Sequence, residues 1–145
     1  MLIEPALYDM ARGDSAVENH INTMTRAREL ADVRDLYGYW SIVSPLMFGR
    51  PASRDRWAED RATAERFAEV VPPWGHNVSA DQFADIPALV VTGAWNEEYE
   101  AIAHRLAAVN VQHVQLEGYR HRPQDHPEFN DLLDRFEGSD PTPGE

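Results

Sequence analysis

The sequence predicts an α/β fold: a parallel sheet of about three strands, with a helical insertion between the first strand and the other two. Three observations support this prediction. The chain opens on a short apolar run that stops at Pro5. Residues 86–137 have the pattern strand, helix, strand, helix, which is typical of a parallel unit with a right-handed crossover. Residues 15–84, which lie between these parts, are helical in pattern.

Length and charge exclude several classes of protein. A chain of 145 residues fits one domain and buries roughly two thirds of its unfolded surface. Its formal net charge of −12 repels nucleic-acid phosphates and anionic membranes, so we expect neither as a partner. No apolar run approaches the roughly 18 residues of a membrane span. The first ten residues lack the basic start of a secretory signal, so we expect a cytoplasmic protein.

Two residue types are missing, and their absence excludes kinds of chemistry. Without cysteine there is no disulfide, thiolate nucleophile or zinc–thiolate site. All 13 basic residues are arginine, which excludes lysine Schiff bases and is typical of a GC-rich, bacterial genome. His20, His76 and His104 show no metal-ligand spacing, so we predict no metal and no cofactor.

The first half of the chain predicts one short strand and two longer helices. Leu2–Glu4 is a strand that ends at Pro5. The capping box Ser15–Glu18 predicts a helix from Ser15 to about Leu36. In the aromatic stretch that follows, Pro45, Gly49 and Pro51 are expected to break any single long helix. A second helix is expected over 53–70, followed by a loop over 76–85.

The second half predicts the rest of the sheet. Residues 88–93 form a short β-branched run that ends in Gly93, as a strand buried on both faces would. Asn96 is placed to cap the next helix. Residues 111–116 alternate with period two, which predicts an edge strand buried on one face. Asp125–Glu128 is a second capping box before the last helix, and 138–145 is expected to be a disordered tail.

The segments I-P-A-L-V-V-T-G-A-W-N from Ile86, V-Q-H-V-Q-L-E-G-Y-R-H-R-P from Val111 and H-P-E-F from His126 resemble the C-terminal part of an α/β-hydrolase. The resemblance implies one truncated domain over 1–137, with a sheet core in 1–5 and 86–137 and a helical cap in 6–85. It also implies a missing half, because no G-x-S-x-G nucleophile turn occurs. Gly13-Asp14-Ser15 is the nearest fragment and follows the wrong strand.

The resemblance places the catalytic histidine and leaves its acid open. His121 follows a strand, a glycine and a turn, at the family's general-base position. The family's acid falls at or near Asn96, which is neutral and cannot stabilise an imidazolium as a carboxylate does. Glu97 and Glu98 are adjacent to it, and Glu4 is a further candidate at the end of its strand. A histidine left over in a non-catalytic protein is the alternative for His121.

A pocket for a small, largely apolar molecule is the second part of the predicted site. Its candidate substrate-binding residues are Trp95, Tyr119, Arg120, Trp40, Tyr37 and Phe48. Arg120 is suited to pair with a ligand carboxylate or with Glu4. For the aromatic residues, packing between cap helices and sheet is the alternative to a pocket between them.

Three functions and one partner follow from these expectations. The chain is an enzyme that uses His121 without a serine nucleophile, a binding protein that has lost its chemistry, or one subunit of a split serine hydrolase. In each case the strand at Leu2–Glu4 lacks a neighbour on one side. Such an open edge can be covered by a second copy, by a separate N-terminal half or by the chain's own cap helices. Because twofold contacts are self-complementary, we expect a homodimer through this strand.

Overall fold

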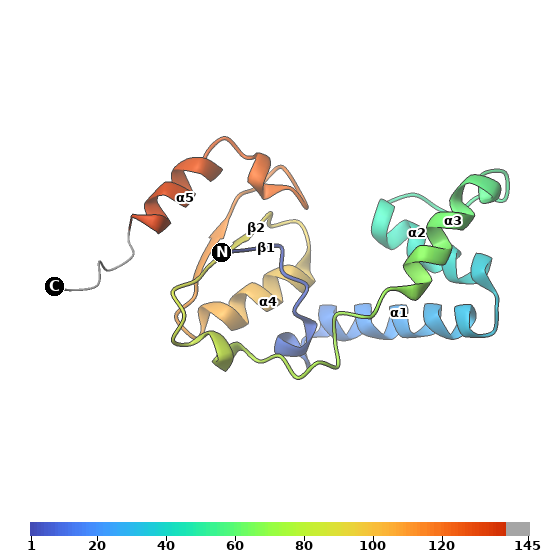
Figure 1. Cartoon of the computed structure of the whole chain (residues 1–145), viewed down its shortest axis with the longest axis horizontal. Helices are drawn as coiled ribbons and strands as arrows, with labels where there is room; N and C mark the ends of the chain where they lie inside the picture. Colours follow the sequence, from blue (N-terminus) through green and yellow to red (C-terminus); the bar gives the residue numbers. More distant parts are fainter. Residues whose placement is uncertain (139–145) are drawn as a thin grey trace. The chain divides into compact units, whose positions relative to one another are not determined.

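The computed structural model describes residues 1–138, and within them it contains a three-stranded parallel sheet in the order β1-β2-β3. The strands are β1 (Leu2–Ile3), β2 (Leu89–Thr92) and β3 (Gln112–Gln115). Leu2 is opposite Val90, and Val90 is opposite His113. The predicted α/β class with about three parallel strands is therefore confirmed (Figure 1). Apart from Gly138, the tail predicted over 138–145 lies outside the described residues.

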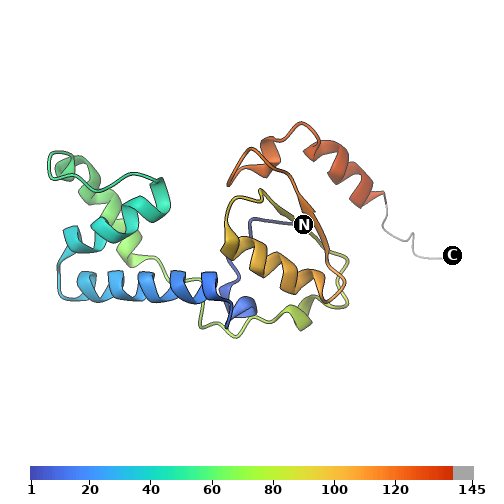
Figure 2. The same cartoon turned by 180° about the vertical axis from the view of Figure 1, so that it is seen from behind.

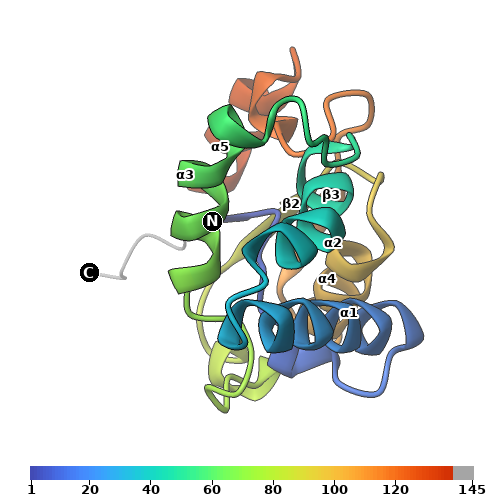
Figure 3. The same ribbon diagram turned by 90° about the vertical axis from the view of Figure 1, so that its right-hand side faces the viewer.

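The central strand β2 is buried on both faces, as its sequence predicts. On one face Leu89 and Val91 pack against Phe129 and Leu132 of helix α5 (Phe129–Glu137). On the other face lies helix α4 (Glu97–Ala107), which contacts both β2 and β3 (Figures 1 and 3). Alternate residues of a strand point to opposite faces, so a strand between two helices is apolar throughout.

The edge strand β3 differs from its prediction. Its alternating sequence predicts burial on one face, yet the neighbours His113 and Val114 are both half-buried. Val114 packs against the α5 side, whereas His113 lies near Glu100 of α4. The prediction of one-sided burial is wrong because helices cover both faces of the sheet at this edge.

Helix α1 (Ser15–Asp32) begins where the sequence predicts but is capped by a different residue. Asp14 Oδ1 accepts the N–H of Ala16 at 2.9 Å, so Asp14 is the N-cap and the capping box predicted at Ser15 is wrong. The helix also ends four residues before Leu36. There Asp35 caps the next helix by accepting the N–H of Gly38 at 2.9 Å.

Pro45 lies inside helix α2 (Leu36–Phe48), where the sequence predicts a break. The helix ends instead at Gly49, whose φ of 64° is left-handed and whose N–H donates to the carbonyl of Pro45 at 3.1 Å. One proline costs a helix a single hydrogen bond, and a glycine in the left-handed conformation satisfies the last carbonyls. The helix therefore continues through Pro45 and ends at Gly49.

The sequence did not predict the short 3-10 helices, and the capping box predicted at Asp125–Glu128 is wrong. They are η1 (Tyr8–Ala11), η2 (Ala80–Phe83) and η3 (Pro123–Asp125). Asp125 ends η3 and pairs with Arg122, with Oδ2 and Nε 2.5 Å apart, so it does not cap α5. Helix α5 begins only at Phe129, after Glu128.

The chain divides into two compact units. One contains Met1–Val17 and the chain from Pro73 onward, and the other is Glu18–Pro72. The second unit is built from most of α1 together with α2 and α3 (Trp57–Glu69), whose ribbons lie together in Figure 2. Their side chains pack around a buried cluster. The cluster consists of Ala27, Tyr39, Trp40, Val43 and Ala64. The sequence predicted the helical insertion over 6–85, a wider range than this unit covers. Within residues 1–138, no helix is both long and apolar enough to cross a membrane.

The N-cap of α4 gives a test of the fold. Asn96 Oδ1 accepts the N–H groups of Glu98 at 2.9 Å and Tyr99 at 3.2 Å. Asn96→Ala removes this acceptor and is expected to lower the free energy of unfolding by about 1 kcal/mol, measured by urea denaturation. Asn96→Asp is the control, because it keeps the acceptor and should stay close to wild type. Equal losses in both variants would contradict a capping role.

Candidate functional site

The candidate site lies where the three strands end. In a parallel sheet the carboxyl ends of the strands meet at one edge, and ligands of such sheets bind there. Glu4 follows β1, residues 93–95 follow β2, and the turn 118–121 follows β3. These three segments meet in the first unit, and we call residues 93–95 the β2 loop.

The carboxylate of Glu4 links β1 to the β2 loop. Its backbone N–H donates to the carbonyl of Val91 at 3.0 Å, which extends the pairing of β1 with β2. Its Oε1 accepts the N–H of Gly93 at 2.5 Å, and its Oε2 accepts the indole Nε1–H of Trp95 at 3.1 Å. Only 7% of the side chain is exposed. Glu4 is therefore a fixed, largely buried carboxylate.

The β2 loop and the turn after β3 are packed backbone to backbone. A Cβ on Gly93 would overlap the carbonyl oxygen of Arg120, so only glycine fits at the end of β2. Glu4, Ala94 and Arg120 all have φ near +50°, a conformation that non-glycine residues rarely adopt. Strained residues of this kind concentrate at functional sites when the surrounding structure holds them in place.

His121 lies next to Glu4. Its Nδ1 is 4.0 Å from Glu4 Oε2, which is within reach of an ion pair but too long for a hydrogen bond. The imidazole meets the ring of Trp95 edge to face, with centroids 4.0 Å apart, and the ring of Tyr99 lies 5.9 Å away. About half of the His121 side chain is exposed. The imidazole is thus walled by aromatic rings and open to solvent on another side.

The surroundings of Glu4 and His121 shift both pKa values in the direction that favours the uncharged form of each side chain. Burial raises the pKa of Glu4, the hydrogen bonds from Gly93 and Trp95 oppose this in part, and the Glu100 carboxylate adds to the rise. Partial burial lowers the pKa of His121, and the Arg120 guanidinium lowers it further. At neutral pH the imidazole is therefore uncharged and able to accept a proton.

Of the acids left open by the sequence, the structure brings Glu4 to His121. Asn96 uses its side-chain oxygen to cap α4 and is a helix cap in this structure. Glu98 Oε2 accepts the hydroxyl hydrogen of the buried Tyr8 at 3.3 Å. Glu97 lies in the first turn of α4, where it is exposed.

Three of the predicted substrate-binding residues belong to the second unit. Trp40 is 1% exposed and donates its indole Nε1–H to Asp60 Oδ2 at 3.2 Å, which fits the alternative of core packing. Tyr37 meets Trp57 edge to face, with ring centroids 5.2 Å apart. Phe48 is partly exposed and packs on Trp40.

The other three lie near His121 in the first unit. The Trp95 ring packs edge to face against the imidazole of His121. Tyr119 is exposed, and its ring faces His126 at a centroid distance of 5.5 Å. Arg120 presents its carbonyl to Gly93 and acts on His121 through its charge.

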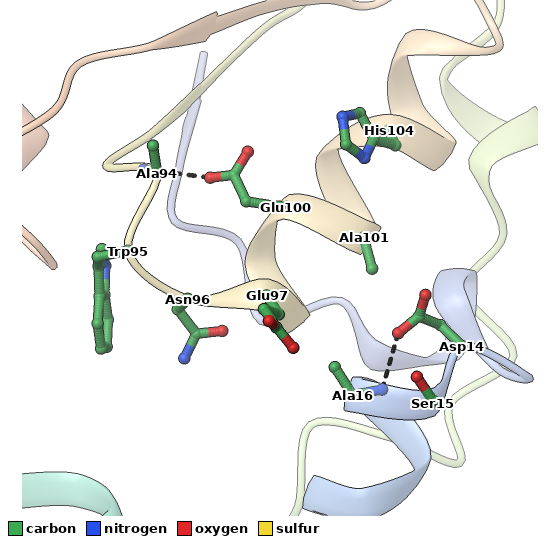
Figure 4. Close-up of a pocket in the computed structure, with 10 residues that line it drawn as sticks. All are labelled: Asp14, Ser15, Ala16, Ala94, Trp95, Asn96, Glu97, Glu100, Ala101 and His104. Carbon is green, nitrogen blue, oxygen red and sulfur yellow. Dashed lines mark hydrogen bonds between the residues drawn. The ribbon is translucent and has the colours of Figure 1, made fainter.

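A hollow that Trp95 helps to line opens between the first turns of α4 and α1 (Figure 4). Small residues line it together with the acidic side chains of Asp14, Glu97 and Glu100. Of the six predicted pocket residues, Trp95 lines this hollow. Across residues 1–138, no group of three or more His, Asp or Glu side chains is arranged to hold a metal ion.

Sequence reasoning missed two residues of the site. Tyr99 was not among the predicted site residues, and its ring faces both Trp95 and His121. Glu100 hydrogen-bonds the β2 loop through the N–H of Ala94 at 3.2 Å. Nothing in the sequence separates Glu100 from the other carboxylates in the first turn of the helix, Glu97 and Glu98.

Comparison with known proteins adds no relative. No protein-family model matches the chain, and neither a curated protein nor a solved structure matches it.

Proposed function

We propose that this chain is an α/β-hydrolase-like protein that acts on a small, largely apolar molecule, with His121 as general acid and base and without a covalent serine of its own. The observation that supports this most directly is the pairing of Glu4 with His121 where β1 and β3 end. A carboxylate beside one imidazole nitrogen leaves the other nitrogen available for proton transfer.

In the proposed reaction the two residues have different roles. His121 Nε2 takes a proton from a water molecule as the water oxygen attacks the carbonyl carbon of an ester. The imidazolium then returns the proton to the leaving alkoxide, so the ester and water become an acid and an alcohol. Glu4 faces Nδ1 and stabilises the positive charge that forms between these steps.

The aromatic rings around His121 supply the apolar part of the site. Trp95 contacts the imidazole directly, and Tyr99 lies beside both rings. On the side where they lie, the rings keep water from the imidazole and so strengthen the interaction between the Glu4 carboxylate and a charged imidazole. They also favour a substrate whose surface is mostly apolar.

Replacement of His121 tests the proposal. We expect His121→Ala to lower hydrolysis of p-nitrophenyl esters by roughly 10²- to 10⁴-fold, because general-base catalysis contributes about that factor. The wild-type rate should rise with pH through the pKa of His121, which lies below the usual histidine value. His126→Ala, in the turn after η3, is the control and should retain the wild-type rate. A wild-type protein that binds such esters without any turnover would contradict catalysis and favour a non-catalytic binding protein.

The raised pKa of Glu4 predicts how stability changes with pH. A carboxyl whose pKa is higher in the folded state stabilises the fold when protonated, and this contribution is lost as pH rises through the folded-state pKa. Glu4→Gln removes this titration while keeping an oxygen to accept the N–H of Gly93. In urea denaturation, wild type should therefore be more stable relative to Glu4→Gln at pH 4 than at pH 7. The opposite trend would show that Glu4 is stabilised as a carboxylate.

The open edge of β1 favours a second candidate function, one subunit of a split serine hydrolase. β1 is the outer strand of the sheet, and Ile3 is 36% exposed. Because the N–H of Glu4 faces β2, the N–H and C=O of Ile3 point away from it. A strand from another polypeptide could pair there and bring a nucleophile to the carboxyl end of β1, beside Glu4 and His121.

The same edge is the basis for proposing a homodimer. An experiment can distinguish pairing with a second copy of this chain from pairing with a different polypeptide. If a second copy pairs with β1, sedimentation should give a dimer, and Ile3→Pro should make it a monomer. Proline is tolerated here because the lost N–H points away from β2. Leu2→Ala is the control, since it keeps every backbone donor. A monomeric wild type would contradict the homodimer and leave the edge to a different chain.

A further inference from the structure

Glu100 is a second carboxylate that holds the β2 loop. Its Oε1 accepts the N–H of Ala94 at 3.2 Å, as Figure 4 shows. The residues before and after Ala94 are held by Glu4, through the N–H of Gly93 and the indole N–H of Trp95. Three consecutive residues of the loop are therefore fixed by two carboxylates, and one of these faces His121.

The other oxygen of Glu100 is anchored to the sheet. Gln115 at the end of β3 donates its side-chain Nε2–H to Oε2 at 2.6 Å. His113 Nε2 lies 3.6 Å from the same oxygen and 2.8 Å from Thr92 Oγ1 at the end of β2. Glu100 thus links α4 to the last residues of β2 and β3, and its side chain has little freedom to move.

The loop needs such an anchor because its backbone is strained. Ala94 has a φ of 54°, in the left-handed region that is unfavourable for a residue with a Cβ. Without an acceptor for its N–H, Ala94 is free to return to a more favourable conformation. Such a movement would displace the adjacent Trp95, whose ring lies against His121.

We propose that Glu100 is a positioning residue for the Glu4–His121 pair and acts through Ala94 and Trp95. The role of this pair rests on the proposed function, whereas the positioning itself is a property of the folded chain. Glu100 does not contact His121 in this arrangement; it fixes the loop whose indole contacts both members of the pair.

Glu97 provides a matched control. It lies in the first turn of the same helix, is exposed, and lines the same hollow as Glu100 (Figure 4). Replacing either residue by alanine removes one negative charge near the helix N-terminus. An effect that comes only from charge or from the helix dipole would therefore be similar in the two variants.

The experiment compares Glu100→Ala with Glu97→Ala by NMR in the full chain. We expect the Trp95 indole N–H to exchange with solvent roughly tenfold faster in Glu100→Ala, and its signal is assigned with Trp95→Phe. The factor is what loss of the hydrogen bond from Ala94 to the charged Glu100 predicts, because this loss lets the loop open more often. The pKa of His121 should rise toward its usual value as the Trp95 ring loosens. In Glu97→Ala the exchange rate should match wild type. Equal exchange rates and equal His121 titrations in the two variants would overturn the proposal.

Two further variants keep the test informative if Glu100→Ala does not fold. Glu100→Gln retains an oxygen for the N–H of Ala94 and should restore slow exchange. Glu100→Asp keeps the charge but is one methylene shorter and does not reach Ala94. Its Trp95 indole N–H should therefore exchange as fast as in Glu100→Ala. Slow exchange in Glu100→Asp would count against positioning through Ala94. Altered exchange in a protein without esterase activity would retain the positioning role and reject the proposed reaction.

Discussion

The candidate site depends on the two hydrogen bonds that the Glu4 carboxylate accepts from the β2 loop. They come from the backbone of Gly93 and the indole of Trp95, and they join the outer strand β1 to the end of the central strand. β1 contains two residues, so its backbone pairing alone holds it weakly. One side chain therefore completes the sheet at this edge and also sets the position of the Trp95 ring that faces His121.

This arrangement places negative charge where the surroundings disfavour it. Glu4 is largely buried, and Glu100 holds the same loop, so the Glu100 carboxylate raises the electrostatic cost of a charge on Glu4. Hydrogen bonds to backbone N–H groups compensate in part, because a peptide N–H offers positive potential without a counterion. The lowered pKa of His121 has a similar origin, since partial burial and then the Arg120 charge oppose its protonation, while Glu4 lies just beyond hydrogen-bond distance.

Those features that depend on local pattern could be predicted from the sequence. The buried strand Leu89–Thr92, the cap at Asn96 and the parallel three-stranded sheet follow from hydrophobicity and capping chemistry. Errors arose where two local signals compete, as at Asp14 and Ser15 for the cap of α1, or where tertiary packing decides, as at His113 on the second face of β3. The choice of Glu4 over Asn96 as the neighbour of His121 is a fact of three-dimensional proximity, which one sequence does not record. Glu100 was missed for the same reason.

The residues that meet in the site are far apart along the chain, and the whole Glu18–Pro72 unit lies between Glu4 and its partners. The hydrogen bond from Gly93 to Glu4 spans 89 positions. The entropy lost on closing so long a connection grows only with the logarithm of its length, so inserting or deleting residues in the intervening helices would cost little in forming this contact. The intervening segment is thus free to vary in size and surface during evolution while the geometry around the imidazole is preserved.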